Sequence, residues 1–157
     1  MQTIRVLVAD DTAETRVNVR HLLQLMGGFE IVDEVSDGLA ALERTLQLKP
    51  DCVLMDVNMP VMGGIAAAAE LSRRAPQVAI VMMSVVGERE NLRQAAAAGA
   101  RDYLIKPFDA EDLVRAIRCA VEKNFNGHSA ATSAIVRVFP MAQENVICEH
   151  SSHPSTR

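Results

Sequence analysis

Four sites in this 157-residue chain place a polar, chemically active residue directly behind a short apolar run. Three of the side chains at these sites are carboxylates, one is a hydroxyl and one is an ammonium group. Three carboxylates brought together would repel one another and raise one another's pKa unless a cation joined them. Ligand sets made only of oxygen favour a hard ion, and Mg²⁺ binds a few carboxylates together with waters. The residue types therefore predict a magnesium site with a hydroxyl and an ammonium group beside it. The residues are Asp10 with Asp11, Asp56, Ser84, and Lys106 followed by Pro107.

The formal charges of this site balance when a magnesium ion is bound. Asp10, Asp11 and Asp56 carry three negative charges, and Mg²⁺ with Lys106 carries three positive ones. A phosphoryl group on Asp56 would add about one to two negative charges. Lys106 and the Ser84 hydroxyl are the remaining groups able to bond its oxygens. The charge balance therefore favours a phosphoryl acceptor.

The elements that must position these residues alternate short β-branched runs with longer helical patterns, which is typical of βα units around a parallel sheet. Several runs are apolar almost throughout, as strands are when helices cover both faces. In such a sheet the functional crevice lies at the carboxyl ends of the strands. We predict an α/β fold with a doubly wound five-stranded parallel sheet, flavodoxin-like with order 2-1-3-4-5, and five helices. The predicted strands are residues 4–9, 30–35, 52–55, 78–83 and 102–105.

Glycine, proline and capping residues delimit the predicted helices. Gly27-Gly28 and Gly99 are typical of helix ends, and Pro50 and Pro76 cannot continue a helix. Asp109 is predicted to cap the last helix, since a carboxylate at that position accepts an amide hydrogen bond. The predicted helices are 12–26, 37–48, a third that follows Gly63-Gly64 and ends before Pro76, 88–98, and one that starts behind Asp109.

Composition and charge limit the function classes. The net charge of −4 gives no electrostatic footprint for a nucleic acid or an anionic membrane. No apolar stretch approaches the roughly 20 residues that a bilayer requires, and no secretory signal is visible, so we predict a cytoplasmic location. Residues 1–123 are predicted to form one domain and residues 124–157 a flexible tail or linker stub. That tail is too short for a DNA-binding domain with its own core, so no direct nucleic-acid contact is expected within this chain.

Taken together and in this order, the motifs resemble the receiver domain of two-component response regulators along residues 4–123. The matching segments are Asp10-Asp11, Asp56-Val-Asn-Met-Pro-Val-Met-Gly-Gly, Ser84 and Lys106-Pro-Phe. The resemblance implies that Asp56 takes the phosphoryl group. It implies that Asp11, Asp56 and the backbone carbonyl of Asn58 bind Mg²⁺, with Asp10 acting through water. It also implies a cis bond between Lys106 and Pro107, Lys106 on the phosphoryl oxygens, and Ser84 with Tyr103 as a switch pair.

The resemblance also implies what the protein works with. A sensor histidine kinase or a phosphotransfer protein would donate the phosphoryl group. The phosphorylated domain would then bind an unknown downstream effector through the face of the fourth helix, fifth strand and fifth helix. A second copy of the chain, in a phosphorylation-dependent homodimer, is the other candidate partner. On this interpretation the chain is a signalling domain with self-phosphotransfer and autodephosphorylation as its only chemistry, and not an enzyme.

Plainer interpretations exist for each residue taken alone. The Asp10-Asp11 pair and Ser84 could cap helices, Asp56 could be a turn residue, Lys106 could be a solvated lysine, and Tyr103 could be half-buried packing.

Two other functions compete with the receiver. A phosphatase of the haloacid-dehalogenase type needs a second carboxylate two residues after Asp56, where Asn58 stands. A flavodoxin-like cofactor binder needs a phosphate-binding loop after the first strand. The segment from Asp10 to Glu14 would repel a phosphate there.

Overall fold

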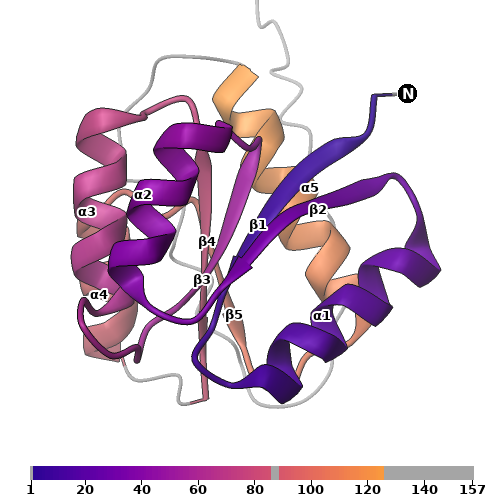
Figure 1. Ribbon diagram of the computed structural model, residues 1–157, viewed down its shortest axis with the longest axis horizontal. Coiled ribbons are helices and arrows are strands. Elements are labelled where there is room, and N and C mark those ends of the chain that lie inside the picture. The colour runs from indigo at the N-terminus through magenta and orange to yellow at the C-terminus, as the bar shows by residue number, and fades with distance from the viewer. Residues whose placement is uncertain (1, 86–88, 126–157) are drawn as a thin grey trace, which may run out of the picture.

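The computed structural model describes residues 2–85 and 89–125 (Figure 1). They form one five-stranded parallel sheet of order β2-β1-β3-β4-β5 with a helix after each strand, which confirms the predicted fold class. The predicted tail lies outside the described residues from residue 126 on. The strands are β1 (Ile4–Ala9), β2 (Phe29–Val35), β3 (Cys52–Asp56), β4 (Ala79–Ser84) and β5 (Asp102–Ile105), and the helices are α1 (Ala13–Met26), α2 (Gly38–Leu48), α3 (Gly64–Arg74), α4 (Arg89–Ala97) and α5 (Ala110–Phe125).

Strands β1 and β5 have the predicted bounds, and most other elements differ from the predicted ones by one residue at an end. Two of these differences concern the site, because Asp56 and Ser84 are the last residues of β3 and β4 rather than the first residues behind them. A third concerns the domain boundary. Helix α5 continues to Phe125, two residues past the predicted boundary at residue 123.

Helices cover both faces of the sheet, with α1 and α5 on one side and α2, α3 and α4 on the other (Figure 1). Successive residues of β1 alternate between the two cores: Leu7 packs on the α2–α4 side and Val8 on the α1–α5 side. Both are fully buried. The nearly continuous apolar runs are therefore explained by a sheet with two covered faces.

Two aspartates cap the first turns of helices, and a glycine follows the end of another helix. The Asp37 carboxylate accepts a hydrogen bond from the Ala40 amide at 2.7 Å, and the Asp109 carboxylate accepts one from the Asp112 amide at 2.8 Å. These contacts satisfy amides that the first turn of a helix leaves without a partner. Gly99 has φ +95°, a conformation that is costly for a residue with a side chain. Among the described helices, none is both long and apolar enough to cross a bilayer.

Candidate functional site

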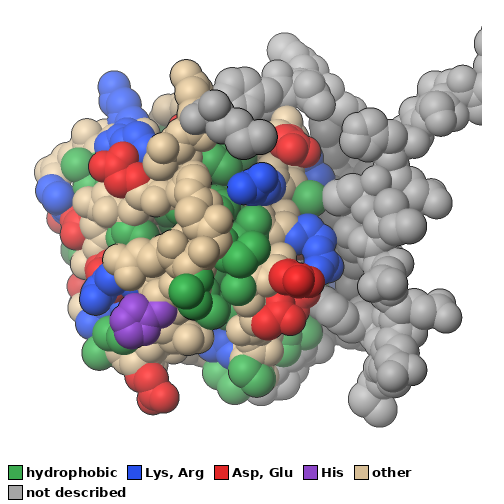
Figure 2. All heavy atoms as spheres, turned by 90° about the vertical axis from the view of Figure 1, so that its right-hand side faces the viewer, with side chains coloured by type: hydrophobic (Ala, Val, Ile, Leu, Met, Phe, Trp, Pro, Cys, Tyr) green, Lys and Arg blue, Asp and Glu red, His purple; other side chains and the backbone are tan. Residues whose placement is uncertain are grey.

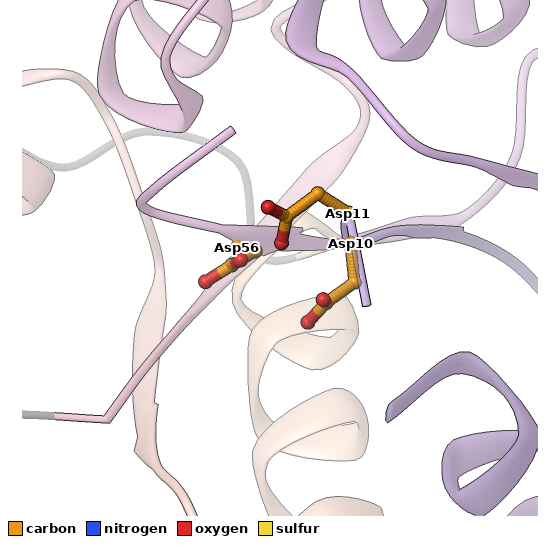
Figure 3. Close-up of side chains that lie close together, drawn as sticks. All are labelled: Asp10, Asp11 and Asp56. Atoms are coloured by element: carbon orange, nitrogen blue, oxygen red, sulfur yellow. The ribbon is translucent and has the colours of Figure 1, made fainter. Parts of the chain in front are cut away.

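The order of the strands brings the three aspartates together. Strands β1 and β3 are neighbours, so the residues that end them lie side by side. One carboxylate oxygen from each of Asp10, Asp11 and Asp56 lies within 4.8 Å of the others (Figure 3). The site thus forms where the sequence predicts it, at the carboxyl ends of the central strands.

Lys106 reaches this cluster from the end of β5. Its backbone amide donates to the Ser84 carbonyl at 2.7 Å, and its bond to Pro107 is cis. The Nζ atom lies 2.6 Å from Asp10 Oδ2 and 3.5 Å from Asp56 Oδ1. The lysine therefore bridges two of the three carboxylates, and its shorter contact is with Asp10.

The three carboxylates differ in their surroundings. Asp10 is completely buried, Asp56 is 5% exposed, and Asp11 is exposed to solvent. Asp10 Oδ1 accepts a hydrogen bond from the Thr12 amide at 2.8 Å, while Oδ2 accepts the one from Lys106. The Asp11 carboxylate accepts a long hydrogen bond of 3.4 Å from the Thr12 hydroxyl. Asp10 is thus held by its neighbours, and Asp11 faces the open side of the crevice.

Burial raises the pKa of Asp56 to about 6. Removal from water is the largest cause, since it penalises the charged form, and repulsion from Asp10 and Asp11 adds to it. Lys106 and the Asn58 backbone amide act in the opposite direction. The carboxylate that the resemblance assigns as the acceptor is therefore the one whose charge is poorly compensated.

The loop behind Asp56 is held by close backbone contacts. The Val57 carbonyl accepts a hydrogen bond from the Gly64 amide at 3.0 Å. A Cβ atom at Gly64 would lie 1.8 Å from the Asp56 carbonyl oxygen, so only glycine fits there. The Gly63-Gly64 pair therefore positions the end of β3 as well as starting α3. Asn58, which the resemblance assigns a carbonyl ligand role, is exposed in this loop.

Ser84 and Tyr103 lie on the same face of the sheet. In the register of β4 and β5, Ser84 is opposite Ile105 and Tyr103 is opposite Met82. The Tyr103 ring is buried in the core on the α2–α4 side, together with Ala95 and Ala98 at α4. The two residues of the predicted switch pair are thus diagonal neighbours beneath α4.

Sequence reasoning missed one contact of the site. The guanidinium of Arg16, in the first turns of α1, donates from Nη1 to the backbone carbonyl of Asp10 at 2.6 Å. The only signal in the sequence is an arginine six residues behind the end of the strand. Such spacing does not reveal which acceptor the side chain reaches, so the contact could not be predicted.

The cluster fits a magnesium ion. Three carboxylates and one ammonium leave two negative charges uncompensated, which a divalent cation would neutralise. Two oxygens on opposite sides of one Mg²⁺ are about 4.2 Å apart, so oxygens within 4.8 Å need only small side-chain rotations. The donors are all oxygen, as this ion prefers.

Comparison with known proteins places the chain in a family. The family model described as response regulator receiver domain matches residues 6–118. The chain is 38% identical to the chemotaxis protein CheY of Bacillus subtilis over 113 residues, which are 72% of this chain and 93% of that protein. It is 43% identical to the transcriptional regulatory protein PdtaR of Mycobacterium tuberculosis over 121 residues, which are 76% of this chain and 57% of that protein.

Solved structures agree with this result. The signal receiver domain of the putative response regulator NarL from Mycobacterium tuberculosis has a TM-score of 0.75 and 31% sequence identity, and the match covers 78% of this chain and 98% of that one. The response regulator domain of Thermotoga maritima CheB has a TM-score of 0.72 at 31% identity, covering 77% of this chain and 98% of that one. The strand order, the acidic cluster and these matches agree: the chain belongs to the response regulator receiver family of two-component signalling.

Proposed function

We propose that Asp56 accepts a phosphoryl group and that the chain works as a phosphorylation-controlled switch. One observation carries the proposal: the buried Asp56 carboxylate lies within 4.8 Å of the Asp10 and Asp11 oxygens and 3.5 Å from the Lys106 ammonium. Membership of the receiver family supports the assignment of this arrangement as a phosphoacceptor site. The family match supports neither the haloacid-dehalogenase nor the flavodoxin-like alternative, and Asn58 and the acidic segment from Asp10 to Glu14 count against them.

The transfer is a displacement at phosphorus. A carboxylate oxygen of Asp56 attacks the phosphorus of a phosphohistidine on a histidine kinase or phosphotransfer protein. The new O–P bond forms as the P–N bond breaks, and the imidazole leaves with the bonding pair and takes up a proton. Lys106 then turns from Asp10 and Asp56 toward the phosphoryl oxygens, where its charge is stabilising. Hydrolysis of the acyl phosphate by water resets the switch.

A magnesium ion in this site would be held by Asp11 and Asp56 together with the Asn58 carbonyl. Asp10 already bonds Lys106 and the Thr12 amide, which supports an indirect role for it. The bound ion supplies positive charge for the phosphoryl oxygens. Without it, two negative charges of the cluster would oppose the approach of an anionic donor.

A surface pocket of about 480 Å³ beside Lys106 is where the phosphoryl donor would bind. It is lined by Val17 and His21 of α1, by Val85 behind β4, and by Pro107 and Phe108 behind β5. On the face that includes α1, hydrophobic side chains gather in the middle with charged ones around them (Figure 2). We infer that the donor packs on this face, because a partner seated there has direct access to the lysine.

The output surface is the face of α4, β5 and α5. Ser84 and Tyr103 connect the acceptor to this face, since they share the side of the sheet that α4 covers. A downstream protein, or a second copy of the chain, would bind there in the phosphorylated state. The cytoplasmic location stays a prediction, and it suits a donor that is itself phosphorylated from ATP.

Acetyl phosphate with Mg²⁺ tests the proposal without a partner protein. Intact-protein mass spectrometry should record one added phosphoryl group of about 80 Da in the wild type and none in Asp56→Asn, because an amide is a poor nucleophile. Asp112→Asn is the matched control, since Asp112 is paired with Arg115 on α5, outside the acidic cluster. Labelling of Asp56→Asn at the wild-type level would refute the assignment.

A further inference from the structure

Asp10 lies in the turn between β1 and α1, and each of its hydrogen-bonding groups has a partner. Its amide donates to the Val35 carbonyl at 3.0 Å, and its carboxylate accepts from the Thr12 amide and from Lys106. The remaining group, the backbone carbonyl, accepts from Arg16 Nη1 at 2.6 Å. This last bond is the one that ties the end of β1 to α1 through a side chain.

The next residue along the chain is Asp11, whose carboxylate is the exposed member of the acidic cluster. Its backbone lies between Asp10, which Arg16 holds, and Thr12, whose carbonyl accepts from the Arg16 amide at 3.3 Å. The Arg16 side chain therefore holds the residue before Asp11, and the helical backbone bond of residue 16 holds the residue after it. Because the Asp11 side chain has little support of its own, its position depends on this backbone.

We propose that Arg16 is a positioning residue for the magnesium site, acting through the Asp10 carbonyl to place the Asp11 carboxylate. The inference rests on the proposed function, because it assumes that the cluster binds Mg²⁺. The forked guanidinium suits the task, since it can hold one carbonyl firmly and keep its charge outside the ligand set. Groups that orient a metal ligand in this way commonly change metal affinity about 10- to 100-fold when they are removed.

A purely electrostatic role for Arg16 makes the opposite prediction. A positive charge near the cluster repels Mg²⁺, so removing that charge would tighten binding of the ion. Loss of a positioning role would instead weaken the binding of Mg²⁺. The sign of the change in the Mg²⁺ dissociation constant therefore separates the two roles, and the free energy of unfolding alone could not.

The experiment compares Arg16→Gln and Arg16→Lys with the wild type by Mg²⁺ titration, followed by the amide signals of residues 10–12 at fixed ionic strength. Arg16→Gln should raise the dissociation constant about 10-fold, and Arg16→Lys should raise it less, because an ammonium keeps the charge and one donor. Arg5→Gln is the matched control. Arg5 Nη1 donates to the backbone carbonyls of Leu48 and Lys49 at 3.0 and 3.1 Å, at the other end of β1, so Mg²⁺ binding should not change.

Labelling by acetyl phosphate gives a second readout. At saturating Mg²⁺ the labelling of Arg16→Gln should recover to within about twofold of the wild type, since Asp56 itself is not displaced. Unchanged or tighter Mg²⁺ binding in Arg16→Gln would overturn the inference, and so would labelling that stays low at saturating Mg²⁺. Wild-type protein that binds no Mg²⁺ would instead overturn the proposed function, so the two failures are distinguishable.

Discussion

Two aspartates of the same sheet, Asp33 on β2 and Asp56 on β3, are shifted in opposite directions. Asp33 Oδ2 accepts a hydrogen bond from Arg44 Nε at 2.5 Å, and this contact lowers its pKa. Burial raises the pKa of Asp56 to about 6, and repulsion from Asp10 adds to it. The comparison teaches that burial and the distribution of cations together decide whether a strand carboxylate stabilises this fold or costs it stability.

On the edge strand β2, the adjacent carboxylates Asp33 and Glu34 each pair with a different arginine. Asp33 pairs with Arg44 of α2 on one face, and the next residue, Glu34, pairs with Arg20 of α1 on the other. At the carboxyl ends of β1 and β3, three carboxylates lie together and Lys106 pairs with only two of them, Asp10 and Asp56. The charges of Asp33 and Glu34 are therefore compensated within the chain, whereas the central site keeps two negative charges that a divalent cation would neutralise.

The largest effect is expected from removing the shared lysine. Lys106→Met leaves the fully buried Asp10 carboxylate without its ion pair, and breaking a buried pair in this way costs about 3 kcal/mol of unfolding free energy. Urea denaturation at pH 7.5 without divalent cations measures the loss. A loss below that of Arg44→Met would contradict the comparison.

Asp56→Asn should act in the opposite direction and stabilise the Mg²⁺-free protein. The amide is of nearly the same size and removes a buried charge that Lys106 compensates only in part. A folded pKa of about 6 against about 3.9 in the unfolded chain corresponds to roughly 3 kcal/mol at pH 7.5. Asp33→Asn, the matched substitution on β2, should destabilise the protein. The same urea titration tests both, and a destabilised Asp56→Asn would show that the Asp56 charge is well compensated.

The same pKa shifts predict a pH dependence. Between about pH 4 and pH 6 the folded protein binds a proton at Asp56 that the unfolded chain has lost, so the Asp56 contribution to stability falls as pH rises through this window. For Asp33 the folded pKa is lowered, so its contribution is present above the unfolded pKa and is lost as pH falls through the folded pKa. Subtracting the pH profile of Asp56→Asn from that of the wild type isolates the first effect. A difference that stays flat from pH 4 to 6 would exclude the raised pKa.

The sequence predicted most of the site because strand order determines which residues meet. Once the apolar runs indicate parallel strands in the order 2-1-3-4-5, the ends of β1 and β3 must be neighbours, and Asp10, Asp11 and Asp56 come together. The direction of the Asp56 pKa shift follows from that proximity. The sequence did not show that burial outweighs repulsion, since exposure depends on how the loops pack.

Other features depend on geometry that residue types do not encode. The register of β1 and β2 shifts between Val6 and Leu7, so that Ile31 is opposite Val6 and Asp33 is opposite Leu7. The shorter distance from Lys106 to Asp10 than to Asp56 depends on side-chain torsions. Strand register and side-chain torsions depend on small differences in packing, and no pattern of residue types specifies them.

The smallest effect is expected at the compensated edge. Arg44→Met removes the partner of Asp33 but leaves a carboxylate that is 29% exposed and can be hydrated, so the cost should stay below about 1 kcal/mol. Salt should screen this contribution, whereas the Lys106 pair, with Asp10 fully buried, should respond much less to salt. Urea denaturation of Arg44→Met and Lys106→Met at low and high ionic strength tests this difference. If both variants lost stability equally and with the same salt dependence, the distribution of cations would not be what distinguishes the edge from the site. If Lys106→Met loses more stability than Arg44→Met and responds less to salt, the uncompensated charge at the ends of β1 and β3 costs the fold stability, and a bound divalent cation would remove that cost.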